Sequence, residues 1–152
     1  MSLLRTDVQM ALNDLHVALM ESADYYRYAA DFLAGPTHQD LCQELQRFSE
    51  ERSAVAGQVE ATIRQAGDLP SVPDADRETG TEWLQRLGAV LDENQATHVL
   101  SQRLEAEEYL LQMLTDYSMA PVQQSHYSLY QQVQQHLQAT CEQLRDLRSK
   151  GV

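Results

Sequence analysis

Apolar residues recur every three or four positions along most of the chain, which is the spacing of one face of an α-helix. The first run comprises Val8, Leu12, Leu15, Leu19, Ser22, Tyr26, Ala29 and Leu33. Thr6 or Asp7 can cap its start. Gly35-Pro36 ends it, because glycine adopts the left-handed conformation at a helix end and proline cannot extend the hydrogen-bond ladder. The pattern therefore predicts one long helix that stops at Gly35.

A second run of the same length comprises Leu41, Leu45, Phe48, Arg52, Val55, Val59, Thr62 and Ala66. It begins after Pro36-Thr37 and ends at Gly67, so the first two helices should pair antiparallel. Residues 67–78 hold two prolines and several acids, which predicts an extended connector. Thr79–Glu82 then spells a capping box, which predicts a short amphipathic helix over Trp83–Leu91.

Two further runs complete the pattern. A second capping box, Asp92–Gln95, begins the third long helix, which stops near Ser118. Its seam comprises Thr97, Leu100, Leu104, Glu107, Leu111 and Leu114. Pro121 suits the first turn of a helix. The last seam comprises His126, Tyr130, Val133, Leu137, Thr140, Leu144 and Leu147, and it ends at Lys150-Gly151.

Four long helices follow from these runs, with a long link between the second and the third. A link of this length can run along a bundle, which makes the second and third helices parallel. We therefore predict an all-α protein with a single domain over residues 1–152. It is a four-helix bundle with a long crossover, containing a short helix, between helices 2 and 3.

Composition agrees with one globular domain and restricts its partners. Of 152 residues, 43% are hydrophobic and 22% are charged, close to globular averages. Lys and Arg number 11 against 23 Asp and Glu, and the net charge of −12 repels phosphate backbones and anionic lipid. We expect no nucleic-acid and no membrane partner. The start has no apolar run of signal-peptide length, which favours a cytoplasmic protein. An exposed helix face would allow a homodimer.

Polar side chains interrupt each apolar seam near the midpoint of its helix. They are Ser22 beside Glu21, Arg52 beside Glu51, Glu107, and His136 at the edge of the last seam. Glu107 lies between Leu104 and Leu111, where a lone buried carboxylate is costly. It must therefore be paired, protonated, metal-bound or wetted.

Nearly the whole chain shares patterns with a known superfamily. They are ALNDL in the first helix, YYRYAA at Tyr25–Ala30, Arg52 in the second helix, the Trp83–Leu87 helix, LEAEE in the third helix and the closing CEQLRDLR. In these the chain resembles the ferritin-like superfamily, and more narrowly a bacterial branch of ferritin-like proteins whose function is not known. The resemblance implies a ferritin-like bundle. Where that branch tends to show a histidine before its final LRDLR-like stretch, this chain has Cys141, which argues against a ligand there.

Catalytic di-iron members of the superfamily use a Glu on each of two helices and an E-x-x-H pair on each of the other two. None of the five histidines here has Glu three residues earlier; those positions hold Asn13, Gly35, Gln95, Gln123 and Val133. Arg52 also brings a positive charge into the seam, which opposes divalent ions. His16, His38 and His98 belong to no ligand-spaced cluster and are expected in solvated or boundary positions.

We favour a buried ion-pair network of Arg52 and Glu107 in a bundle without metal or other cofactor. Such a bundle would have a structural or interaction role, including a stress-related one, and no enzymatic activity. The alternative is an atypical metal-binding ferritin-like protein that oxidises or stores iron. Its ligands would be Glu21, Glu51, Glu107 and His136, binding iron, manganese or zinc.

Two cysteines offer a test of the topology. With the crossover, Cys42 near the start of helix 2 and Cys141 near the end of helix 4 lie at the same end of the bundle on adjacent helices. In a simple up-down-up-down bundle they lie at opposite ends. A redox pair is possible only in the first arrangement, and two small buried thiols are the favoured interpretation even there.

Overall fold

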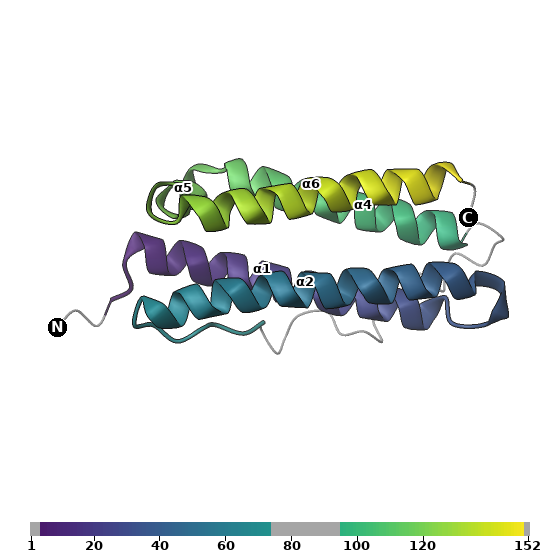
Figure 1. Ribbon diagram of the computed structural model, residues 1–152, viewed down its shortest axis with the longest axis horizontal. Coiled ribbons are helices and arrows are strands. Elements are labelled where there is room, and N and C mark those ends of the chain that lie inside the picture. Colours follow the sequence, from purple (N-terminus) through teal and green to yellow (C-terminus); the bar gives the residue numbers. More distant parts are fainter. Residues whose placement is uncertain (1–3, 74–94, 151–152) are drawn as a thin grey trace.

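The computed structural model describes residues 4–73 and 95–150, and these residues form helices joined by turns and loops, without a strand. The elements in chain order are α1 (Asp7–Phe32), η1 (Pro36–His38), α2 (Gln39–Gln65), α4 (Gln95–Thr115), η2 (Tyr117–Met119), α5 (Ala120–Ser125) and α6 (Tyr127–Ser149) (Figure 1). The all-α class is confirmed. The short helix predicted over Trp83–Leu91 and its capping box Thr79–Glu82 lie outside the described residues.

Local signals at the two ends of α1 act as predicted. The Thr6 hydroxyl accepts a hydrogen bond from the Gln9 amide at 3.2 Å, and the Gln9 side chain accepts one from the Thr6 amide at 2.8 Å. This reciprocal pair is a capping box, and it identifies Thr6 as the cap. At the other end Gly35 has a φ of 137°, a conformation that side-chain-bearing residues rarely adopt, immediately before Pro36.

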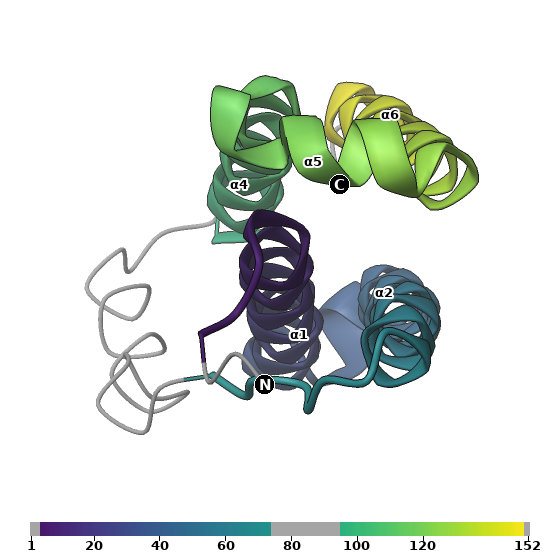
Figure 2. The same ribbon diagram turned by 90° about the vertical axis from the view of Figure 1, so that its left-hand side faces the viewer.

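The long helices form two pairs, α1 with α2 and α4 with α6, which lie in two layers when seen end-on (Figure 2). The starts of α2 and α4 share one core cluster, whose members include Leu41, Leu45, Ala96 and Leu100. Their ends share a second, whose members include Val59, Ile63, Leu110 and Leu114. The two helices therefore run in the same direction.

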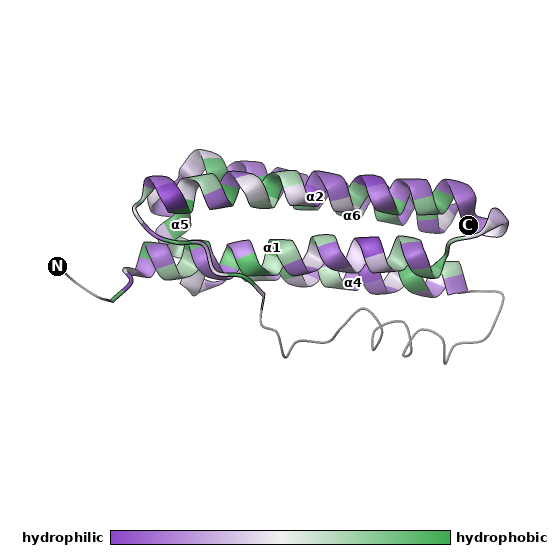
Figure 3. Cartoon of the chain, turned by 90° about the horizontal axis from the view of Figure 1, so that it is seen from below, coloured by the Kyte–Doolittle hydropathy of each residue, from purple (hydrophilic) through white to green (hydrophobic). Residues whose placement is uncertain are grey.

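Each long helix presents mixed hydrophobic and hydrophilic residues along its length (Figure 3). The hydrophobic ones form the two core clusters, and the polar layer described below lies between them. The last part of the chain differs from the prediction, because the helical stretch that contains Pro121 and the last seam is divided at His126 into α5 and α6. The backbone of His126 leaves the helical region with φ of −136° and ψ of 57°. Pro121 lies in the first turn of α5, as predicted.

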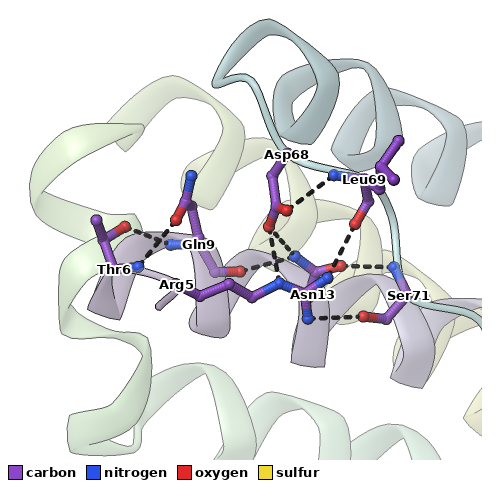
Figure 4. A network of polar contacts seen from close by, with 7 residues as sticks. All are labelled: Arg5, Thr6, Gln9, Asn13, Asp68, Leu69 and Ser71. Carbon is purple, nitrogen blue, oxygen red and sulfur yellow. Dashed lines mark hydrogen bonds and ion pairs between the residues drawn. The ribbon is translucent and has the colours of Figure 1, made fainter. Parts of the chain in front are cut away.

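The chain after α2 is held against the first half of α1 (Figure 4). The Asn13 amide donates to the Asp68 carboxylate at 2.9 Å, and its oxygen accepts from the Ser71 amide at 2.6 Å. Arg5 pairs with Asp68 at 3.0 Å. His16 Nδ1 lies 2.7 Å from the Ser71 carbonyl oxygen, and His16 is only 3% exposed. The prediction of a solvated or boundary His16 was wrong, because this segment covers it.

Candidate functional site

A buried ion pair lies between the two core clusters, at mid-height in the bundle. Arg52 in the middle of α2 and Glu107 in α4 approach to 2.8 Å between Nη2 and Oε2. Both side chains are only 1% exposed. Each stands on the apolar seam of its own helix, so the packing of the seams brings the two charges together. The predicted Arg52–Glu107 pair is therefore present in the structure.

Side chains from three further positions complete the coordination of the Arg52 guanidinium. Nη1 donates to the Ser22 hydroxyl of α1 at 2.6 Å, and Nε donates to His136 Nε2 of α6 at 2.9 Å. Nη2 also lies 3.5 Å from the Thr140 hydroxyl. All three guanidinium nitrogens thus have acceptors, and the four long helices all contribute. A buried arginine with every nitrogen engaged does not carry the desolvation cost of an unpaired cation.

Tyr26 of α1 provides the second contact to Glu107. Its hydroxyl donates a short hydrogen bond to Glu107 Oε1. The centre of its ring lies 5.5 Å from the centre of the Phe48 ring. Burial raises the pKa of Tyr26 well above its ordinary value, and the Glu107 carboxylate raises it further. Tyr26 therefore stays protonated and acts as a donor. Both carboxylate oxygens of Glu107 are engaged, one by Arg52 and one by Tyr26.

His136 is held in its neutral form. Burial lowers its pKa to about 4, and the Arg52 guanidinium contributes to the shift. Because Nε2 accepts a hydrogen bond from Arg52, the ring proton is assigned to Nδ1. The lone pair that would bind a metal is directed at the guanidinium instead.

Arg103 is a buried charge that sequence reasoning missed. It is 6% exposed, and its guanidinium carbon lies 5.2 Å from the Tyr25 ring centre and 5.6 Å from that of Tyr26. Burial lowers its pKa. A signal was present, because Arg103 precedes Glu107 by four positions and such residues share a helix face. The apolar seam drawn through Leu100 and Leu104 concealed it.

The four candidate metal ligands are not brought together. Glu51 is exposed and pairs with Arg47 at 2.7 Å. Glu21 is half-buried in a groove between α1 and α4, beside Arg103. Neighbouring residues on a helix point about 100° apart, so Glu21 and Glu51 turn aside when Ser22 and Arg52 face the core.

The donor chemistry of this layer does not suit a metal ion. Glu107 and His136 do lie in the same layer, but Arg52 occupies the space between them and takes up their acceptor atoms. Within residues 4–73 and 95–150, no three His, Cys, Asp or Glu side chains lie where they could hold a metal ion. The structure therefore does not bring the predicted ligands Glu21, Glu51, Glu107 and His136 together. Only Glu107 and His136 share this layer, and both bind Arg52.

The two cysteines share a core cluster but lie far apart along it. Cys141 follows Thr140, whose hydroxyl reaches Arg52, while Cys42 precedes Arg52 by almost three turns of α2. At 1.5 Å per residue this places them roughly 10 to 15 Å apart along the bundle, even allowing for the length of the arginine. A disulfide needs Cα atoms about 4.4 to 6.8 Å apart. Both thiols are buried and free.

Comparisons with protein-family models, with curated proteins and with solved structures found no match to this chain. No helix in the described part of the chain is both long enough and apolar enough to cross a membrane. The geometry itself therefore carries the functional argument. It shows a polar layer in which the Arg52 guanidinium binds a carboxylate, an imidazole and a serine hydroxyl, while a phenol donates to the same carboxylate.

Proposed function

We propose that this protein is a ferritin-like four-helix bundle in which a charge network replaces the metal centre. Its role is structural or an interaction with another protein, and not metal oxidation. The shared direction of α2 and α4 and the sequence resemblance support the ferritin-like assignment. One observation carries the functional part: the Arg52 guanidinium binds Glu107 in the position that a metal ion would take, and Tyr26 donates to the other carboxylate oxygen.

The network gives the bundle a defined arrangement at a modest cost. A buried ion pair adds little net stability, because the desolvation of two charges offsets much of their attraction. It does disfavour rotated or shifted helices, since these would leave a charge buried without its partner. A bundle of this kind presents fixed outer faces, which suits a protein that binds others by its surface.

The proposal predicts strong energetic coupling between Arg52 and Glu107. Arg52→Met and Glu107→Leu should each destabilise the fold by about 3–5 kcal/mol, because each leaves one buried charge unpaired. The double variant should lose clearly less than the two single losses together. Urea unfolding followed by circular dichroism measures all three. As a control, Arg64→Ala breaks the exposed Arg64–Glu60 pair and should cost about 1 kcal/mol or less.

Metal content separates this proposal from the iron-binding alternative. Protein purified from cells grown with added iron, manganese and zinc should contain far less than one equivalent of each metal, as measured by inductively coupled plasma mass spectrometry. Near-stoichiometric metal that is lost in Glu107→Ala would instead establish a metal site and refute the proposal. Additive losses in the double variant would show that the two charges do not act as a unit.

A further inference from the structure

Exposed aromatic and thioether side chains gather at one end of the bundle, where α1 begins and η2 joins α4 to α5. We call Met10, Tyr117 and Tyr127 the tyrosine patch; their exposed fractions are 47%, 91% and 56%. Tyr117 is central, because it lines the hollow that contains Met10 and also the hollow that contains Tyr127. Exposed tyrosine and methionine are enriched at protein interfaces and rarely cluster without a reason.

Two surface hollows beside Tyr117 give a partner's side chains a place to insert. The hollow between α1 and α5 has a volume of about 550 Å³, and the one beside α6 about 360 Å³. Both fall in the range of sites that accept a ligand or an inserted side chain. Tyr117 stands between them and is held by its turn, in which the Asp116 carboxylate accepts from the Ser118 amide at 3.0 Å. This capped turn therefore fixes the position of Tyr117 between the two hollows.

The charge around the tyrosine patch has one sign. Asp7 and Asp14 line the first hollow, and Asp116 lines the second. Neither Lys nor Arg is among the described residues that line either hollow. Carboxylates beside tyrosine rings attract a cation twice, through its charge and through the face of the ring. The surroundings therefore select a partner with positive charge next to apolar side chains.

Charge also decides between the possible occupants. A second copy of the chain carries a net charge of −12 and is repelled at long range. Nucleic acid and anionic lipid are repelled for the same reason. We propose that the tyrosine patch docks an arginine-bearing, partly apolar segment of a different protein. This inference rests on the proposed interaction role and names the surface and the kind of partner.

A binding experiment with defined peptides tests the surface. The probe is a short fluorescein-labelled peptide of Arg, Leu and Ala, with a matched peptide in which every Arg is replaced by Gln. Fluorescence anisotropy should show binding of the Arg peptide and at least about tenfold weaker binding of the Gln peptide. Tyr117→Ser should weaken the Arg peptide about tenfold, the loss typical of an interface hot spot. Tyr109→Ser removes a tyrosine that is 70% exposed elsewhere and should change the affinity by about twofold or less.

Matched charge variants remove the contribution of net charge alone. Asp7→Asn with Asp14→Asn should weaken the Arg peptide about fivefold, whereas Glu105→Gln with Glu142→Gln should have an effect of about twofold or less. Equal effects of the two double variants, or equal binding of the Gln peptide, would overturn the proposal. So would a wild-type dimer, seen by sedimentation, that Tyr117→Ser dissociates. None of these outcomes depends on the Arg52–Glu107 coupling or on metal content, so this inference and the proposed function fail separately.

Discussion

The charged side chains at mid-height in the bundle are hydrogen-bonded to one another and to neighbouring polar side chains. Arg52 reaches acceptors on α1, α4 and α6, and Glu107 receives donors from α1 and α2. The contact with His136 is the most sensitive to conditions, because imidazole is the only partner that titrates near neutral pH. Protonation would place a second positive charge against the Arg52 guanidinium. The hydrogen bond from Arg52 to His136 therefore depends on pH.

We expect His136 to lower the stability of the fold in mild acid. Its pKa is about 4 in the folded protein and about 6.5 in an unfolded chain. Between these values the unfolded chain binds a proton that the folded protein does not. The contribution of neutral His136 to the free energy of unfolding is therefore fully present above about pH 7 and is lost as the pH drops toward 4. His136→Gln keeps an acceptor for Arg52 and should reduce this loss by at most about 3 kcal/mol.

Urea titrations at several pH values between 7 and 4 measure the effect. His98→Gln, at an exposed position on α4, serves as the control and should follow the wild-type curve. An unchanged pH dependence in His136→Gln would show that the imidazole does not stay neutral in the core.

Among the helices, α1 has the most varied contacts. It carries Ser22 and Tyr26 of the network, packs on α2 along its length, and holds the chain that leaves α2. Asn13 makes this last contact with both ends of its side-chain amide. Asn13 and His16 of α1, together with Arg5 just before it, therefore hold the segment over residues 68–71.

Asn13→Ala should loosen the segment over residues 68–71 without unfolding the bundle. The change removes one donor to Asp68, which keeps its contact with Arg5, and it takes away the acceptor of the Ser71 amide, at a cost of about 1–3 kcal/mol. Hydrogen exchange should become faster at residues 68–71 and stay slow in the middle of α2. Thr6→Ala, which weakens only the cap of α1, should not have this local effect. Equal protection in wild type and Asn13→Ala would contradict the assignment.

In the assembled bundle, parallel α2 and α4 decide which distant residues become neighbours. Arg52 and Glu107 both lie near the middle of their helices and would meet in either direction. Residues near the helix starts depend on the direction: Leu41 and Ala96 share one core cluster, which also contains both cysteines, although these are not at one height. Burial raises the pKa of Cys42, and it raises the pKa of Cys141 to about 11. Neither thiol is therefore poised for redox chemistry, because the thiolate is the reactive form.

The folded protein should keep both thiols after mild oxidation. With diamide at about pH 8, mass spectrometry should find no Cys42–Cys141 disulfide, because the sulfurs cannot meet without backbone movement. Iodoacetamide should label both residues slowly in the native state and rapidly in guanidinium chloride. A native intramolecular disulfide would show that the start of α2 and the end of α6 pack in a different register.

Apolar periodicity was enough to predict the helices, their approximate ends and the polar interruption of each seam. These features depend on neighbours three or four positions apart, and a sequence records them directly. Thr6 and Gly35-Pro36 were readable for the same reason. The break at His126 was not, since its spacing continues the seam and only the backbone angles interrupt it. The burial of His16 was equally hidden, because the segment that covers it is distant in sequence.

The partners of the polar residues were decided by tertiary structure. From the sequence, Arg52 and Glu107 stood as the favoured ion pair, and Glu21, Glu51, Glu107 and His136 stood as the alternative set of metal ligands, because each lies near the middle of a helix. The rotation of each helix about its axis then turned Glu21 and Glu51 aside, and the depth of packing made Arg52 the common partner of Glu107 and His136. Helical spacing is a local property, whereas the choice of partner depends on how four helices are oriented around a shared core.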